Sequence, residues 1–87
     1  FNLTKYGNGL FINNICVSSD NRRKGIAKKL ITNIIKNSKK KNINFLFLQV
    51  KNNNVGAIKL YKSLGFKEHH RFSGSGGITY LNMILHL

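Results

Sequence analysis

Two kinds of apolar pattern alternate along the chain, one typical of strands and one typical of helices. Residues 10–17 (LFINNICV) and 45–50 (FLFLQV) are short apolar runs, and the second is continuous enough for a strand covered on both faces. The two Asn inside the first run predict a bulge or the end of strand pairing. From Gly25 onward the apolar residues fall at helical spacing, which predicts an amphipathic helix: Ile26, Leu30, Ile31, Ile34 and Ile35.

The rest of the chain predicts a second helix followed by two strands. Asn54 is a natural N-cap for a short apolar-periodic helix, and Gly65 suits the C′ position that ends it. Strands are expected at 66–72 and 78–86, with SGSGG (73–77) between them. This glycine-serine segment has the composition of a flexible linker, either native or engineered in place of a longer insertion. The predicted order is β-α-β-α-β-β, an α/β domain with a parallel, right-handed crossover.

Length and composition limit the chain to one small domain. It has 87 residues, 41% of them hydrophobic, which favours a packed core over disorder. One cysteine, Cys16, cannot form an intramolecular disulfide, so we expect a reducing compartment and a cytoplasmic location. No apolar run reaches the roughly 20 residues of a membrane span. Because residue 1 is Phe, we expect a fragment or a trimmed chain, and any leader or membrane tail would lie outside it.

The charge of the chain is strongly one-sided. Fifteen Lys and Arg stand against two acids, Asp20 and Glu68, for a net charge of +13. Such a field favours anionic partners: phosphates, nucleic acid or an acidic membrane surface. Codon use in an AT-rich genome would produce the same excess of Lys and Asn, so charge alone does not select a function.

The most basic stretch, NRRKGIAKKL (21–30), lies where the first helix is expected to begin. A helix N-terminus offers unpaired N–H groups and a partial positive charge, and both suit a phosphate. Gly25 and the small Ala27 would let the backbone approach an anion closely, while Arg22, Arg23 and Lys24 add charge. The stretch has neither the two glycines and Lys-Ser/Thr of a P-loop nor the glycine spacing of a dinucleotide-binding turn. Taken on its own, the stretch is better explained as a plain basic helix start than as a phosphate site.

A second stretch, LQVKNNNVGAIKLYKSLGF (48–66), follows at the distance of one strand. Together with RRKGIA (22–27), it resembles motifs A and B of the GNAT acetyltransferases, and the resemblance covers roughly residues 10 to 87. It implies a GNAT-like mixed sheet, of which this chain is the C-terminal half. The first strands and helices of the usual domain, which help to form the acceptor site, are missing from it.

Within that family the chain most resembles the protein N-terminal α-amine acetyltransferases. The stretch FKEHHRF and the later ITYLNMIL are close to the Golgi-associated eukaryotic member, and the bacterial ribosomal-protein alanine acetyltransferases are a second relative. The resemblance implies transfer of an acetyl group from acetyl-CoA to a protein N-terminus. A small amine (an amino sugar, polyamine or antibiotic) is an alternative acceptor. A catalytically weak module that docks on RNA or the ribosome through its basic surface is another alternative.

The resemblance also implies roles for particular residues. Backbone N–H groups of Ile15, Cys16 and Val17 would bind pantetheine and the thioester carbonyl in a gap between strands 10–17 and 45–50. Tyr61 would protonate the departing thiolate, as a phenol can. The remaining cofactor-binding residues would be Arg22, Arg23, Lys24, Gly25, Ile26, Ala27, Lys28 and Asn54.

The general base is where the sequence departs from the family. Relatives carry a Tyr on the first strand and a His or Glu on the second, and this chain has Phe11 and Gln49, which take no proton at neutral pH. Three explanations stay open: a base in the missing N-terminal half, water alone acting on an amine of low pKa, or reduced or lost activity. Gln49 remains a catalytic candidate because its amide can orient a water. Phe11, Asn13 and Tyr80 are expected to line the acceptor site. No Cys or His spacing suits zinc, so no metal is expected.

Overall fold

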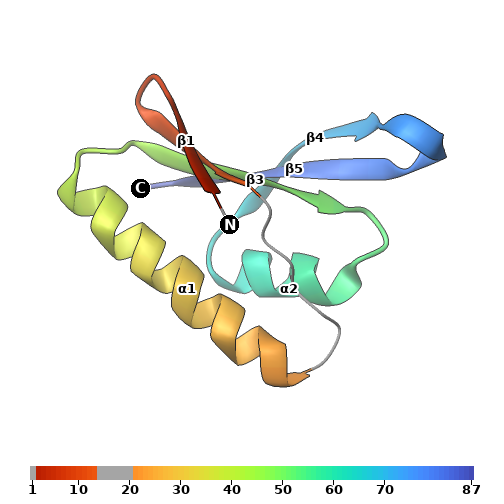
Figure 1. Ribbon diagram of the computed structural model, residues 1–87, viewed down its shortest axis with the longest axis horizontal. Coiled ribbons are helices and arrows are strands. Elements are labelled where there is room, and N and C mark those ends of the chain that lie inside the picture. The colour runs from red at the N-terminus through yellow and green to blue at the C-terminus, as the bar shows by residue number, and fades with distance from the viewer. Residues whose placement is uncertain (1, 14–20) are drawn as a thin grey trace.

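The computed structural model describes residues 2–13 and 21–87, without the side chains at 2, 6, 13, 21–24 and 75. One mixed sheet, with strand order β1-β2-β3-β5-β4, carries two helices on the same side (Figure 1). The elements in chain order are β1 (Asn2–Tyr6), β2 (Gly9–Asn13), α1 (Asn21–Lys40), β3 (Phe45–Lys51), α2 (Val55–Ser63), β4 (Lys67–Ser73) and β5 (Thr79–His86). The expected α/β class and the parallel β2–β3 pair joined through a helix are confirmed.

The first strand, β1, is an addition to the predicted order. It pairs antiparallel with β2 from Asn2↔Asn13 to Tyr6↔Gly9, which leaves Gly7 and Asn8 as a two-residue turn. Gly7 has a φ of 56°, a conformation that glycine adopts without strain. The short polar segment NLTKY carries little apolar signal because β1 is an edge strand.

Helix α1 begins at Asn21, so the expectation that it starts at Gly25 is wrong by one turn. Arg22, Arg23 and Lys24 therefore belong to the first turn of the helix and not to a preceding loop. A glycine within a helix costs only a modest amount of stability, so Gly25 lies inside α1 and does not mark its first residue.

The core lies between the two helices and one face of the sheet. Alternate residues of the central strands point into it, and each is almost fully buried: Leu46, Leu48, Val50, Leu81 and Met83. Ile31 and Ile34 of α1 and Ala57 and Tyr61 of α2 close the core from the helix side.

The opposite face of the sheet is aromatic and half-exposed. Phe11 and Phe47 meet edge to face with ring centroids 4.9 Å apart, and the rings of Phe72 and Tyr80 stack at 5.6 Å. Both described helices lie on the other side of the sheet, so neither covers these rings (Figure 1). Phe11 and Tyr80, two of the residues expected to line the acceptor site, therefore occur on the face that the described helices leave open.

Helix α2 begins and ends at the residues that the sequence indicated. The Asn54 side chain accepts a hydrogen bond from the Ala57 N–H at 3.2 Å, which confirms the N-cap. Gly65, at a φ of 101°, occupies the C′ position. Its N–H donates to Lys62 O, and the N–H of Phe66 donates to Tyr61 O, the pair of bonds that defines a Schellman motif.

The glycine-serine segment 73–77 connects two strands of one hairpin. The N–H of Gly74 donates to Ile78 O at 2.6 Å across a short 3₁₀ turn, Ser75–Gly77. Gly76 and Gly77 both have positive φ, 72° and 75°. The composition that resembles a linker is thus also what this tight turn requires.

Candidate active site

Tyr61, the expected proton donor, is buried at the helix–sheet boundary. It lies in the last half of α2 and is only 1% exposed, and its ring centroid is 6.0 Å from that of Phe66. The Schellman motif holds the backbone at Tyr61 in place, because the carbonyl oxygen of Tyr61 accepts hydrogen bonds from the N–H groups of Leu64 and Phe66. The phenol is therefore held in one place, as a positioned acid must be.

The basic start of α1 has the backbone chemistry of a phosphate site. The first four N–H groups of a helix have no partner within it, and here they belong to Asn21, Arg22, Arg23 and Lys24. Gly25 follows in the same helix and is exposed, and a Cβ built there would meet no described atom within 4 Å. The described fold thus leaves the space beside Gly25 open, which suits the close approach of a phosphate group.

Ala27, which was expected beside a bound anion, lies in the hydrophobic core. It is 6% exposed and lies in the core, so its small size lets α1 pack close to the sheet. The neighbouring Ile26 is 69% exposed, and Lys28 is exposed as well. Packing explains Ala27 without a ligand, and a role for its backbone toward an anion stays a prediction.

Three expected cofactor residues, Ile15, Cys16 and Val17, lie outside the described residues, as does the expected bulge after Asn13. The described β2–β3 ladder runs from Gly9↔Phe45 to Ile12↔Leu48. Beyond Leu48, β3 continues as Gln49 to Lys51, paired with β5 on its other side. Gln49 is therefore the first residue of β3 past the described ladder with β2.

Gln49 and Phe11 lie on the open aromatic face, opposite Tyr61. Leu48 and Val50 point toward the helices, so Gln49 between them points the other way and is exposed. Tyr80 faces the same side and is half-buried against Phe72. The described structure thus brings Gln49, Phe11 and Tyr80 together on one face and places the candidate acid on the other, while the side chain of Asn13 lies outside the description. A substrate that met both would have to reach through the sheet near Gln49.

One polar residue that the sequence did not single out also lies on the open face. Asn82 of β5 is registered with Gln49 of β3 on one side and with His70 of β4 on the other. Its Oδ1 atom is buried and accepts no hydrogen bond from the described residues. Because YLNMIL reads as an apolar strand with one polar interruption, only the register reveals these neighbours.

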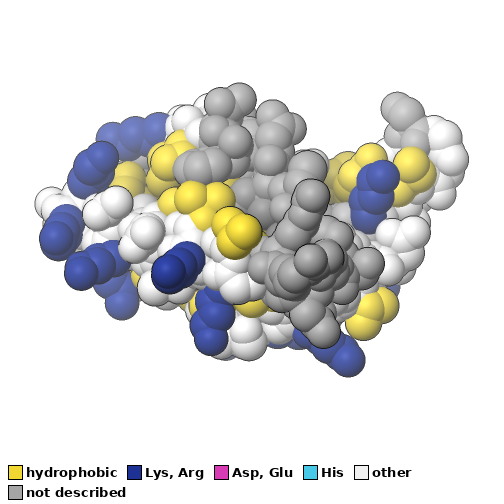
Figure 2. Space-filling view, turned by 60° about the horizontal axis from the view of Figure 1, so that its bottom comes forward, with side chains coloured by type: hydrophobic (Ala, Val, Ile, Leu, Met, Phe, Trp, Pro, Cys, Tyr) yellow, Lys and Arg dark blue, Asp and Glu magenta, His cyan; other side chains and the backbone are white. Residues whose placement is uncertain are grey.

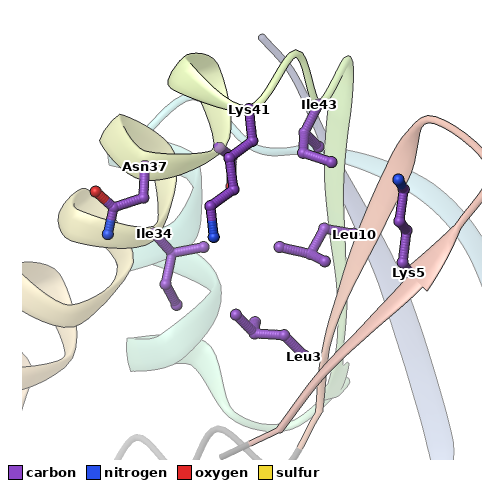
Figure 3. Close-up of a pocket in the computed structure, with 8 residues that line it drawn as sticks. Leu3, Lys5, Leu10, Ile34, Asn37, Lys41 and Ile43 are labelled. Carbon is purple, nitrogen blue, oxygen red and sulfur yellow. The ribbon is translucent and has the colours of Figure 1, made fainter.

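The described residues also form a cavity, which lies away from these candidate residues. It has a volume of about 390 Å³ and lies between β1 and the C-terminal half of α1, with Leu3, Leu10 and Ile34 as its apolar wall and Lys5 and Lys41 at its sides (Figure 3). It is at the far end of α1 from Gly25. Within the described residues there is no group of His, Cys, Asp or Glu that would hold a metal ion, and no helix is long and apolar enough to cross a membrane.

The only pKa shift in the described site region concerns Glu68 on β4. Arg71 donates a hydrogen bond to its carboxylate at 2.9 Å, which lowers the pKa of Glu68, and the charge of Lys62 acts in the same direction. The pair is exposed, so its effect on stability is small. Glu68 is thereby kept ionised and makes a poor general base.

The chain is similar in sequence to known acetyltransferases. A model of the acetyltransferase (GNAT) family matches residues 2–66. The [ribosomal protein bS18]-alanine N-acetyltransferase of Escherichia coli (strain K12) is 40% identical over 55 residues, which are 63% of this chain and 37% of that protein. The chain therefore spans well under two thirds of this curated relative.

Solved structures agree with the fold. The crystal structure of the Escherichia coli ribosomal-protein-S18-alanine N-acetyltransferase superimposes with a TM-score of 0.80 at 28% identity, over 97% of this chain and 57% of that one. The NatC complex bound to Gag peptide and CoA gives 0.82 at 25% identity, over 99% and 57%. A putative streptothricin acetyltransferase from Bacillus anthracis in complex with acetyl coenzyme A gives 0.81 at 26% identity, over 98% and 53%.

Proposed function

Because the chain belongs to the GNAT acetyltransferase family, we propose that it is the cofactor-binding part of an acetyl-CoA-dependent N-acetyltransferase whose acceptor is a protein N-terminus. The observation that carries this proposal is the basic first turn of α1, with Gly25 beside open space. Acetyl-CoA would supply the acetyl group as a thioester and a diphosphate as the anion to be held. Those needs match a helix N-terminus with two arginines in its first turn.

Different residues of the chain would bind the cofactor, donate the proton and orient the acceptor side. The N–H groups of the first turn of α1, with Arg22, Arg23 and Lys24 in that turn, hold the diphosphate. Tyr61, buried at the end of α2, gives its phenolic proton to the leaving sulfur. Asn54 caps α2 and so fixes the helix that carries Tyr61. The exposed amide of Gln49 orients a water on the acceptor side.

The acceptor class rests on similarity and on the open aromatic face. The curated relatives act on the alanine of a ribosomal protein, and one solved relative holds a peptide with CoA. A half-exposed face with Phe11 and Tyr80 suits the first side chains of a peptide better than a highly charged small amine. The closer resemblance to the Golgi-associated member and the cytoplasmic location stay predictions.

Acetyl transfer to a peptide library by the full-length protein tests the proposal. We expect turnover of peptides with a free α-amine and none of the same peptides with a blocked N-terminus. An aminoglycoside, a polyamine and streptothricin serve as small-amine competitors. Turnover of these and not of peptides would replace the acceptor class while leaving the donor and the fold in place.

A row of exposed lysines supports a second proposal, a polyanionic docking partner. This row, the lysine ridge, consists of Lys28, Lys29, Lys36, Lys39 and Lys40 on the outer side of α1. Lysine side chains gather over the C-terminal half of this helix in Figure 2. Glu68, the one acid that the structure describes, pairs with Arg71 on β4, so no described carboxylate neutralises the ridge.

The ridge suits RNA better than a membrane surface. Lys29 and Lys40 are about 16 Å apart along the helix axis, a span that reaches several phosphates of one strand. The exposed residues between them include Asn33 and Asn37, and side-chain amides are among the groups that contact phosphate and sugar in nucleic-acid complexes. A membrane-binding helix would need a large apolar group there.

Binding of a structured RNA over a range of salt concentrations tests the ridge against a general excess of charge. We compare K29Q/K36Q/K40Q with the matched control K59Q/K62Q/K67Q, which removes three exposed lysines from α2 and β4. The ridge variant should reduce the slope of log K against log salt by about 2 to 3 and the control should change it far less. Equal losses in both variants would show that the charge is not organised for docking.

A further inference from the structure

A polar row crosses the open aromatic face at one level of the sheet. It consists of Gln49 on β3, Asn82 on β5 and His70 on β4, which are registered one to the next across the three strands. Neighbouring strands lie about 4.8 Å apart, so the whole row spans about 10 Å. Aromatic rings border it, among them Phe47 next to Gln49 along β3 and the stacked pair Phe72–Tyr80.

The middle of this row holds an acceptor without a donor. Asn82 Oδ1 is buried and receives no hydrogen bond from the described residues. A buried acceptor that is left unsatisfied destabilises a fold, and such groups in native proteins call for a specific explanation. The neighbours on both sides, Gln49 and His70, are polar and exposed, so a ligand that brings its own N–H groups can reach the two ends of the row, and it meets the buried Asn82 Oδ1 only if the side chains over that atom move.

The outer end of the row carries the one side chain of the three that can take a proton. Gln49 is an amide and Asn82 is an amide, whereas His70 is an imidazole, a common general base in enzymes. The His70 ring stacks on Phe72 with centroids 6.3 Å apart and planes 12° apart, which holds it flat along the strand. The adjacent His69 falls at the register shift between Glu68 and His70 and has no registered partner on β5.

We propose that this row is the acceptor-amine subsite, in which Asn82 Oδ1 accepts a hydrogen bond from the amine and His70 removes a proton through a bridging water. This deepens the proposed function and rests on it. It also supplies what Phe11 and Gln49 lack, a proton acceptor on the side of the sheet where the acceptor binds. Asn82 acts as a positioning residue and His70 acts as the base.

The proton and bond changes balance. The ammonium of the acceptor gives one proton through water to an imidazole nitrogen of His70, and the free amine attacks the thioester carbon. A C–N bond forms and the C–S bond breaks, and Tyr61 gives its phenolic proton to the sulfur. The new amide nitrogen loses its second proton to water, Tyr61 regains one from water, and His70 returns its proton to solvent. One acetyl group has moved and one proton has been released overall.

The near-isosteric variant Asn82→Leu separates this role from packing. Removing the unsatisfied oxygen should leave the free protein as stable or raise its Tm by a few degrees. The same change should raise KM for an acceptor peptide by about tenfold or more, with CoA affinity unchanged. Higher stability with an unchanged peptide KM would overturn the proposal, and so would a loss of stability with unchanged peptide affinity.

His70→Gln tests the base, and His69→Gln is the matched control on the same strand. We expect H70Q to lower kcat about 100-fold and added imidazole to restore part of it, while H69Q keeps the wild-type rate. Equal rates in H70Q and wild type, or a loss without rescue that H69Q shares, would exclude His70. Failure of the proposed function looks different, because the wild-type protein would then neither bind CoA nor acetylate any peptide.

Discussion

Phe66 and Tyr61 are joined twice, through backbone and through side chain. The Phe66 N–H donates to the Tyr61 carbonyl oxygen at 3.0 Å, and the two rings lie with centroids 6.0 Å apart. The contact between these positions is the apolar element that accompanies a Schellman motif. The motif that ends α2 therefore also holds the candidate acid in place.

Tyr61→Phe should lower kcat and leave binding intact. The substitution removes only the hydroxyl from a residue that is 1% exposed, so packing against Phe66 is kept. Loss of one general acid costs about 100-fold or more in rate. Steady-state kinetics of the full-length protein, with CoA affinity measured by calorimetry, checks this. An unchanged kcat would show that Tyr61 is a core aromatic and that the proton comes from elsewhere.

Gly65→Ala should destabilise the protein and disturb Tyr61. A φ of 101° strains any residue with a Cβ, and the added atom would lie 3.0 Å from Leu85 Cδ1. We expect a loss of about 1 to 2 kcal/mol in the free energy of unfolding. Urea denaturation measures it, and Lys62→Ala, on the exposed side of the same helix, is the control. A neutral result would mean that the helix end relaxes freely.

Asn54→Ala should cost about 1 kcal/mol of stability through the lost N-cap. The cap bond to Ala57 N–H is 3.2 Å long and is the side-chain contact that orders the start of α2. Asn54→Ser keeps a capping oxygen and should recover most of the loss. Thermal unfolding of the three proteins compares them. If serine and alanine destabilise equally, the role of Asn54 is not that of a cap.

The sequence predicted those parts of the fold in which local chemistry and apolar period agree. Asn54, Gly65 and the run FLFLQV each carry their own signal, and each occurs where it was expected. The missed strand β1 is an edge strand of polar residues, so its alternation was weak, although the Gly7–Asn8 turn was a usable hairpin signal. The early start of α1 was hidden because Gly25 looks like a boundary.

Some of the candidate site residues could be named from the sequence, but their arrangement could not. Motif residues such as Tyr61 and Gln49 could be named from the sequence because they occur at fixed positions in a resemblance. That they lie on opposite faces of the sheet follows only from strand alternation and helix placement together. The polar row was beyond the sequence, since Asn82 and His70 meet Gln49 through pairing of strands that are far apart along the chain.

Gly25→Ala should raise the stability of the free protein and weaken its binding of CoA, so it tests the diphosphate site. An alanine within a helix is about 0.5 to 1 kcal/mol more favourable than a glycine, and the described fold leaves the position open. The free variant should therefore unfold at a higher temperature than wild type. If a phosphate approaches the backbone there, the same methyl group should weaken CoA binding by about tenfold or more.

The most direct test of the account is the thermal shift that CoA produces in wild type and in the Gly25→Ala variant. Binding to the native state alone raises Tm, and 100-fold excess over Kd is worth about 2.7 kcal/mol. The account predicts a clear shift in wild type and a shift about half as large or smaller in the variant at the same CoA concentration, because a tenfold weaker affinity lowers the stabilisation from about 2.7 to about 1.4 kcal/mol. Equal shifts in both proteins, or none in wild type at millimolar CoA, would contradict a CoA diphosphate site at the start of α1.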